Sequence, residues 1–255
     1  MSVLDLFDLR GRTALITGAS TGIGRKVAEA YLQAGARVAI AARHTDALKR
    51  VAAELSSDDG AVLTVGCDVT RPDQVNRMVE RVTAEFGGID IAVCNAGIIN
   101  LVPMLEMSPE EFQAIQDTNV TGVFLTAQAA ARAMVAHGRG GAIITTASMS
   151  GHIINIPQPA GHYCTSKAAV IQLTKAMAVE LAPHNIRVNS VSPGYILTEL
   201  VEPMAEYHRL WEPKIPLGRI GRPDELTGLY LYLASDASSY MTGSDVVIDG
   251  GYTIP

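Results

Sequence analysis

The stretch Thr17-Gly18-Ala19-Ser20-Thr21-Gly22-Ile23-Gly24 joins a short apolar run to an amphipathic segment of helical period. Glycines in such a strand-to-helix turn permit a tight bend and close backbone approach to a pyrophosphate. The free N–H groups and the positive dipole end of the helix favour an anion. The spacing G-x-x-x-G-x-G departs from the common G-x-G-x-x-G, but the strand before it and the helix after it are the required context. The stretch predicts a dinucleotide-binding turn made by Gly18, Ser20, Thr21, Gly22, Ile23 and Gly24.

Short apolar runs alternate with longer amphipathic segments, and glycine or proline stands at many of the joins. This alternation favours a parallel sheet covered on both faces, because right-handed crossovers carry the helices there. We expect an α/β fold: a single-domain Rossmann fold over residues 1–255, with a seven-stranded parallel doubly wound sheet and helices on both faces. The expected strands are Thr13–Thr17, Arg37–Ala41, Val62–Val65, Ile89–Val93, Ala142–Thr146, Arg187–Val191 and Val246–Ile248. The expected helices are Ile23–Ala34, Asp46–Leu55, Pro72–Phe86, Pro109–Ala136, Gly161–Leu181 and Pro223–Ala234.

The bulk composition favours small molecules as ligands. Hydrophobic residues make up 48% of the chain and charged residues 18%, and no linker separates two compositions. The net charge of −6 comes without a basic stripe, which argues against nucleic acid or an anionic membrane surface as a partner. No apolar run has membrane-spanning length and the amino-terminus is not basic, so we expect a cytoplasmic protein. The cysteines lack metal-ligand spacing and predict buried thiols, with no metal site: Cys67, Cys94 and Cys164.

The end of the second expected strand bears on the choice of nicotinamide cofactor. An acidic residue there accepts a hydrogen bond from the ribose 2′-hydroxyl of NAD(H), whereas a guanidinium matches a 2′-phosphate. The sequence is Ala41-Ala42-Arg43-His44, without a carboxylate. NADP(H) is therefore preferred, with Arg43 as its anchor, and NAD(H) is the alternative; Asp46 looks like a helix amino-terminal residue. After the third strand, Asp68 and Val69 are placed to meet the adenine, although Asp68 can instead cap the next helix.

A tyrosine and a lysine stand four residues apart in Tyr163-Cys164-Thr165-Ser166-Lys167, at the head of an expected helix. Residues at this spacing lie one above the other, so a phenol and an ammonium can face one pocket. A nearby cation stabilises the phenolate, and lowering the phenol pKa from ~10 to about 7 takes roughly 4 kcal/mol. Alone, the pair is more often a packed ring beside a solvated charge. Together with the glycine turn it indicates a redox enzyme.

Four motifs in order resemble the short-chain dehydrogenase/reductase family: Thr17 to Gly24, Asn95-Ala96-Gly97, Tyr163 to Lys167 and Pro193-Gly194. The segment from Gly218 to Tyr252 also resembles the carboxyl end of that family, so the likeness spans nearly the whole chain. It implies a catalytic set of Asn119, Ser148, Tyr163 and Lys167.

In that family the tyrosine is the general acid for ketone reduction and the base for alcohol oxidation, which makes Tyr163 the proton donor. Lys167 is then expected to lower its pKa and to hold the nicotinamide ribose. Asn119 would connect Lys167 to solvent through water; its structural alternative is a helix-interior amide bonded to nearby backbone.

The catalytic serine follows the fifth strand, where two serines compete. The family's thirteen-residue spacing to tyrosine selects Ser150. The pattern of serine three before glycine selects Ser148, and loops accept insertions more easily than strands accept a register slip. We therefore choose Ser148 to bind the substrate oxygen.

The resemblance also implies residues around the nicotinamide end of the cofactor. Asn95 looks like a backbone-organising amide, and Ala96 and Gly97 let the chain pass close to the cofactor. The loop after the sixth strand is expected to meet the carboxamide, although Thr198 can also cap the short helix that follows. The implied cofactor residues here are Asn95, Ala96, Gly97, Pro193, Gly194, Ile196 and Thr198, beside Tyr163 and Lys167.

Two segments are expected to form the substrate site. A lid at about residues 197–216 can close over a ligand. The loop before Tyr163 adds Asn155 and Gln158, amides suited to binding several hydroxyls. Together with the closing Asp-Gly-Gly-Tyr-Thr, this resembles the branch of the family that acts on sugars and polyols, such as sorbose and mannitol dehydrogenases.

The expected function is therefore an NADP(H)-dependent oxidoreductase that interconverts a secondary alcohol and a ketone on a small-molecule substrate. A 3-oxoacyl thioester or steroid ketone reductase of the same family is one alternative. A nucleotide-sensing protein without turnover is an alternative of another class, which the complete catalytic set disfavours. The resemblance also implies a homotetramer built by pairing the two long helices Pro109–Ala136 and Gly161–Leu181.

Overall fold

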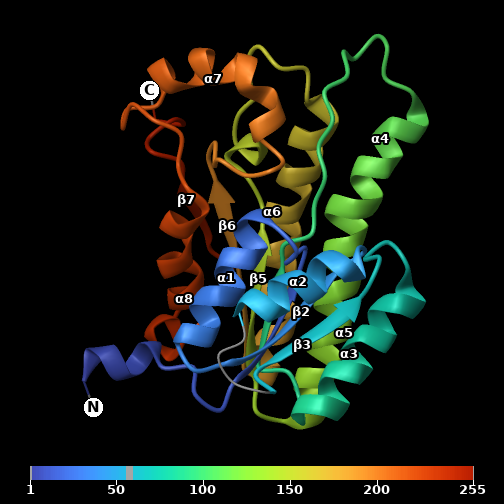
Figure 1. Ribbon diagram of the computed structural model, residues 1–255, viewed down its shortest axis with the longest axis vertical. Coiled ribbons are helices and arrows are strands. Elements are labelled where there is room, and N and C mark those ends of the chain that lie inside the picture. Colours follow the sequence, from blue (N-terminus) through green and yellow to red (C-terminus); the bar gives the residue numbers. More distant parts are fainter. Residues whose placement is uncertain (1, 56–59, 255) are drawn as a thin grey trace.

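A single seven-stranded sheet organises the chain in the computed structural model, which describes residues 2–55 and 60–254. Every pair of neighbouring strands is parallel, in the order β3-β2-β1-β4-β5-β6-β7 (Figure 1). The doubly wound parallel sheet predicted from the sequence is confirmed. The strands are β1 (Thr13–Thr17), β2 (Arg37–Ala42), β3 (Val62–Gly66), β4 (Ile91–Cys94), β5 (Gly141–Thr146), β6 (Ile186–Pro193) and β7 (Asp245–Ile248).

Helices cover both faces of the sheet, and each face has its own core. Strand side chains alternate between these cores, so Leu15 packs in one while Ala14 and Ile16 pack in the other. This burial on both faces explains why the strands read as continuous apolar runs. One core includes α1 (Gly22–Gln33), α2 (Thr45–Leu55) and α8 (Thr227–Ala234), and the other includes α3 (Pro72–Phe86), α5 (Gly122–His137) and α6 (Gly161–Leu181).

The helix expected over Pro109–Ala136 is interrupted, which corrects the sequence prediction. The structure has α4 (Pro109–Gln116), a π-helical turn (Asp117–Thr121) and then α5. The Asn119 side chain inside this turn bonds to the backbone of Ile98 and to Ser166, and these contacts favour the wider turn. Such turns within helices are frequent at functional sites. The helix expected over Pro223–Ala234 likewise begins with a 3-10 turn, Pro223–Leu226, before α8.

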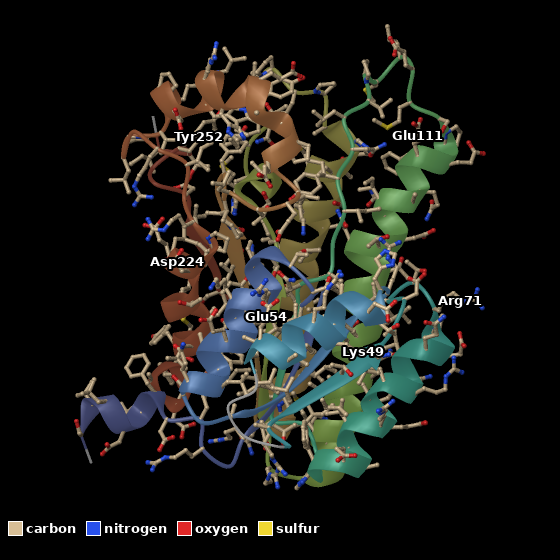
Figure 2. All side chains as sticks on the ribbon, viewed as in Figure 1. Lys49, Glu54, Arg71, Glu111, Asp224 and Tyr252 are labelled. Carbon is tan, nitrogen blue, oxygen red and sulfur yellow. The ribbon has the colours of Figure 1, made fainter. Side chains whose placement is uncertain are left out.

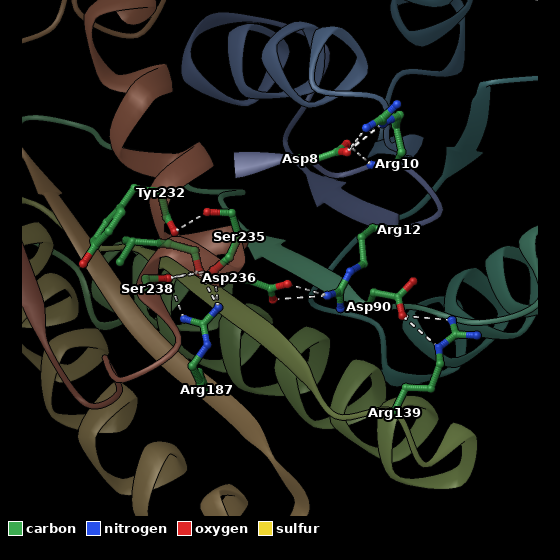
Figure 3. A network of polar contacts seen from close by, with 11 residues as sticks. Asp8, Arg10, Arg12, Asp90, Arg139, Arg187, Tyr232, Ser235, Asp236 and Ser238 are labelled. Carbon is green, nitrogen blue, oxygen red and sulfur yellow. Dashed lines mark hydrogen bonds and ion pairs between the residues drawn. The ribbon is translucent and has the colours of Figure 1, made fainter. Parts of the chain in front are cut away.

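Charged side chains tie the elements together at the amino ends of the strands (Figure 3). Asp90 is almost fully buried; its carboxylate accepts hydrogen bonds from the Thr13 N–H at 2.9 Å and from Arg139 Nη2 at 2.9 Å. Arg187 of β6 donates to the carbonyl oxygens of Leu233 at 3.0 Å and Ser235 at 3.1 Å. A cation is favourable at this carboxyl end of α8, where helix carbonyls lack partners.

A third, smaller core lies above the carboxyl ends of the strands, under α7 (Ala205–Trp211). Trp211 is fully buried there against Tyr195 and Ile215. Tyr252, from the closing segment of the chain, packs against the same cluster (Figure 2). The expected lid at 197–216 is thus a docked wall made of α7 flanked by the 3-10 turns Glu202–Met204 and Glu212–Lys214. No helix among the described residues is both long and apolar enough to span a bilayer.

Candidate active site

A cleft of about 710 Å³ opens at the carboxyl edge of the sheet. Strand order reverses between β1 and β4, which is where a doubly wound sheet binds its ligand. Among the predicted catalytic and cofactor-binding residues, Gly24 and Asn119 are not part of the lining. The other predicted catalytic and cofactor-binding residues all line this one cleft: Gly18, Ser20, Thr21, Gly22, Ile23, Arg43, Asp68, Val69, Asn95, Ala96, Gly97, Ser148, Tyr163, Lys167, Pro193, Gly194, Ile196 and Thr198.

The glycine turn leaves no room for a side chain at Gly18 or Gly24. Gly18 has a φ of +65°, and a Cβ atom there would lie 2.8 Å from the Cα atom of Ala96. A Cβ atom on Gly24 would lie 2.6 Å from the carbonyl oxygen of Gly18. The turn therefore brings bare backbone to the start of α1, where unpaired N–H groups face the cleft. This cradle fits the pyrophosphate of a dinucleotide.

Asn95 joins this turn to β4. Its Nδ2 atom donates to the carbonyl oxygens of Thr17 at 3.0 Å and Gly18 at 3.2 Å. In return, Thr17 Oγ1 accepts from the backbone N–H groups of Asn95 at 3.1 Å and Ala96 at 3.2 Å. The placement agrees with the expected backbone-organising amide, and it fixes the spacing of the two loops that border the cleft.

Arg43 and Asp68 line the cleft near the ends of β2 and β3. Asp68 does not cap α3, since that helix begins after Arg71; its Oδ1 atom instead accepts from the N–H of Thr70 at 3.0 Å and from its hydroxyl at 2.8 Å. Burial opposes ionisation of Asp68, but these bonds and the charges of Arg43 and Arg71 lower its pKa overall. The carboxylate stays ionised beside the guanidinium of Arg43.

Lys167 is buried behind Tyr163. Its Nζ atom donates to the carbonyl oxygen of Thr146 at 2.8 Å and lies 5.6 Å from the centroid of the Tyr163 ring. A Cβ atom on Gly97 would lie 3.6 Å from Lys167 Nζ and 3.3 Å from Asn119 Oδ1. The bare backbone of Gly97 therefore occupies the space between the ammonium and the amide.

Asn119 is fully buried, and both the oxygen and the nitrogen of its side-chain amide form hydrogen bonds. Its Oδ1 atom accepts from the N–H of Ile98 at 2.8 Å, and its Nδ2 atom donates to the carbonyl of Ile98 at 2.9 Å and to Ser166 Oγ at 3.1 Å. The alternative predicted from the sequence is an amide bonded to nearby backbone. The partners of Asn119 are instead Ile98 and Ser166, which are distant in the sequence. Asn119 thus fixes the loop after β4 against α6.

The structure separates the two candidate serines. Ser148 lines the cleft, whereas Ser150 is buried outside the lining and donates its backbone N–H to Ser148 Oγ at 3.1 Å. The Ser148 hydroxyl also donates to Ser150 Oγ at 3.1 Å. Ser150 therefore orients Ser148, which faces Tyr163.

The titrating groups respond first to burial. Burial raises the pKa of Tyr163 to about 12, and a hydrogen bond with Ser148 offsets only part of this rise. Burial also lowers the pKa of Lys167 to about 8. The Tyr163 shift is opposite to the one expected from the sequence. The reason is geometric: the ammonium is directed to the Thr146 carbonyl, and desolvation penalises the phenolate.

Asn155 and Gln158 do not line the cleft, which corrects the expectation that their amides bind substrate hydroxyls. Both are buried, and their Nδ2 and Nε2 atoms donate to the Tyr195 hydroxyl at 2.9 and 2.7 Å. They support the wall of the site. Thr198 lines the cleft next to Gly22, and the short turn after it has Val201 at its amino-cap, so Thr198 does not provide the expected side-chain cap.

Comparison with known proteins assigns the family. A family model described as enoyl-(acyl carrier protein) reductase matches residues 18–253. The crystal structure of a short-chain type dehydrogenase/reductase from Mycobacterium marinum is 76% identical, with a TM-score of 0.98 and full coverage of both chains. The chain belongs to the short-chain dehydrogenase/reductase family. It is therefore an oxidoreductase, and the resemblance read from the sequence is confirmed.

Two curated relatives come from the expected branch of this family. Sorbose reductase of Candida albicans is 42% identical over 100% of this chain and 91% of the relative. A probable NADP-dependent mannitol dehydrogenase of Yarrowia lipolytica is 42% identical over 100% of this chain and 92% of the relative. The likeness extends over the whole site, lid segment included.

Several residues of this short-chain dehydrogenase/reductase cleft were not predicted. Thr146 accepts from Lys167 through its backbone carbonyl, and its hydroxyl bonds to the Tyr230 hydroxyl at 2.8 Å. A backbone carbonyl has no signature in a sequence, and the other additions are mostly apolar. The unpredicted lining residues are Ala41, Ala42, His44, Cys67, Ile98, Thr118, Thr146 and Ala147, whereas Glu199, Leu200 and Val201 belong to the segment predicted as a lid.

Proposed function

We propose that this protein is an NADP(H)-dependent oxidoreductase that interconverts a secondary alcohol and a ketone, on a sugar or polyol, with Tyr163 as the acid/base. The observation that carries the proposal is that Ser148, Tyr163 and Lys167 share one cleft with the glycine turn. A protein that only senses a nucleotide needs the glycine turn but does not need Ser148, Tyr163 and Lys167.

The preference for NADP(H) rests on Arg43. Its guanidinium lines the cleft near the end of β2, and no carboxylate stands at that strand end. A guanidinium binds a phosphate through charge-assisted, often bidentate hydrogen bonds. A relative named as a probable NADP-dependent mannitol dehydrogenase supports the same choice.

The bound nicotinamide would supply or accept the hydride at the substrate carbon. Tyr163 donates a proton to the ketone oxygen in reduction and takes it back in oxidation. The Ser148 hydroxyl bonds to the same oxygen, oriented by the N–H of Ser150. Lys167 binds the nicotinamide ribose and supplies positive charge near the phenol, while Asn119 holds the adjoining loop.

The substrate class rests on the relatives, named as a sorbose reductase and a mannitol dehydrogenase. The test is initial-rate absorbance of the reduced nicotinamide with NADPH and NADH in parallel, across ketoses, acyl thioesters and steroid ketones. We expect turnover of sorbose or fructose with NADPH preferred. Turnover restricted to acyl thioesters or steroid ketones would overturn the substrate class, and a preference for NADH would overturn the cofactor choice.

A further inference from the structure

A closed ring of contacts surrounds the Tyr195 hydroxyl beside the cleft. The hydroxyl oxygen accepts from Asn155 Nδ2 at 2.9 Å and from Gln158 Nε2 at 2.7 Å. Gln158 Oε1 in turn accepts from the indole Nε1 of Trp211 at 3.1 Å. The Tyr195 and Trp211 rings stack with centroids 3.8 Å apart and planes 6° apart, which closes the ring.

The chemistry of the donors fixes one orientation of this network. An indole N–H only donates, so Gln158 must turn its oxygen to Trp211 and its amino group to Tyr195. All four side chains are buried, from 0% exposure for Trp211 to 8% for Tyr195. An unpaired polar group in such a place costs about 1–3 kcal/mol, so the contacts are expected to form or break together.

The network joins three segments that border the reacting end of the cleft. Asn155 and Gln158 lie in the loop that leads into α6 and Tyr163. Tyr195 lies between Gly194 and Ile196, which both line the cleft. Trp211 ends α7, and the residues that lead into this wall, Glu199, Leu200 and Val201, line the cleft.

We propose that Tyr195 is a positioning residue whose hydroxyl locks the loop Pro193–Thr198 to the Tyr163 loop and to docked α7. Through Ile196 and Thr198, this lock sets the depth of the nicotinamide end of the cleft relative to Tyr163. Since the three segments share one set of buried bonds, they shift as a unit when ligands bind. The inference rests on the proposed function in so far as it assigns the nicotinamide to this end of the cleft.

Tyr195→Phe removes the hydroxyl and keeps the stacked ring. The matched control is Tyr31→Phe, which likewise removes a buried, hydrogen-bonded phenol hydroxyl. The Tyr31 hydroxyl donates to the Tyr230 carbonyl at 2.9 Å, and Tyr31 is not among the residues that line the cleft. We expect both variants to lower the Tm. Only Tyr195→Phe should lower kcat, by about tenfold or more, because small misplacements of reacting groups are costly. Its Kd for NADP⁺ should change less than about threefold, because the glycine turn is untouched.

Trp211 gives a readout that does not depend on the substrate. It is the single tryptophan of the sequence and is fully buried, so its fluorescence reports the docking of α7. We expect NADP⁺ to change the emission of the wild type. We expect Tyr195→Phe to shift the emission to longer wavelength and to weaken the change that NADP⁺ causes. Tyr31→Phe should match the wild type.

Two outcomes separate this inference from the proposed function. If Tyr195→Phe matches Tyr31→Phe in kcat and in Trp211 emission, the hydroxyl is only structural and the inference is wrong. If the wild type reduces no sugar but the emission differences between the variants hold, the substrate proposal fails and the positioning role of Tyr195 stands.

Discussion

The Lys167 ammonium is bonded to the carbonyl oxygen of Thr146, at 2.8 Å, and is not aimed at the Tyr163 hydroxyl. Thr146 is the last residue of β5, and Lys167 lies in the second turn of α6. This bond fixes the cation at the edge of the sheet, next to the phenol ring and facing the cleft. The position suits a residue that binds the nicotinamide ribose and supplies charge to the phenol at the same time.

Removal of the Tyr163 hydroxyl separates catalysis from binding. For Tyr163→Phe we expect turnover to fall by about 10²–10⁴-fold, the range for loss of a general acid or base. The Kd for NADP⁺ should stay within about threefold, because the cradle of Gly18 and Gly24 is unchanged. Stopped-flow hydride transfer and a binding titration measure the two quantities. Turnover equal to the wild type would remove Tyr163 from the mechanism.

Removal of the Arg43 guanidinium should reduce the discrimination between cofactors. A hydrogen bond to a charged group contributes about 1.5–3 kcal/mol, so for Arg43→Ala we expect the KM for NADPH to rise about 10–100-fold. The KM for NADH should hardly change, since NADH lacks the 2′-phosphate. Lys49→Ala is the control, because this lysine lies exposed on neighbouring α2 (Figure 2). An equal rise in KM for both cofactors would mean that Arg43 supports the fold of the cleft and does not bind the 2′-phosphate.

The sheet and most of the cleft could be predicted because their signals are local. Buried parallel strands read as apolar runs, and the glycine turn is marked by the glycines between one strand and one helix, although the close contact that requires Gly18 comes from Ala96 of another segment. The π-helical turn at Asn119 could not be predicted, because it depends on contacts with Ile98 and Ser166 from other segments. The orientation of a side-chain amide also depends on residues that are distant in the sequence. The amide of Gln158 donates to the Tyr195 hydroxyl, a contact that only the folded structure shows.

The half-buried guanidinium of Arg187 should stabilise the junction of β6 with α8. Arg187→Met leaves the carbonyls of Leu233 and Ser235 without this donor, and we expect the free energy of unfolding to fall by about 2–3 kcal/mol. The control is Arg12→Met, which breaks only the more exposed pair with Asp236 and should cost less than about 1 kcal/mol (Figure 3). Urea unfolding of both variants measures the difference. Equal losses would contradict a specific role for the Arg187 guanidinium.

The low pKa of Lys167 predicts a variant that is inactive but more stable at neutral pH. Burial lowers this pKa from 10.5 to about 8, so the folded protein carries an unfavourable buried charge at pH 7. Below pH 8 that cost is on the order of 3 kcal/mol, and it diminishes as the pH rises from 8 towards 10.5, because the unfolded chain then binds more protons than the folded one.

Lys167→Met has no such charge, so its stability relative to the wild type should be greatest at pH 7 and should fall by about 2–3 kcal/mol at pH 10. Loss of the bond to Thr146 lowers the stability of Lys167→Met by a similar amount at both pH values. The change in relative stability between pH 7 and pH 10 is therefore unaffected. Urea unfolding of both proteins at pH 7 and pH 10 gives this difference. A relative stability independent of pH would show that Lys167 has an ordinary pKa, and the burial that positions it behind Tyr163 would then carry no electrostatic cost.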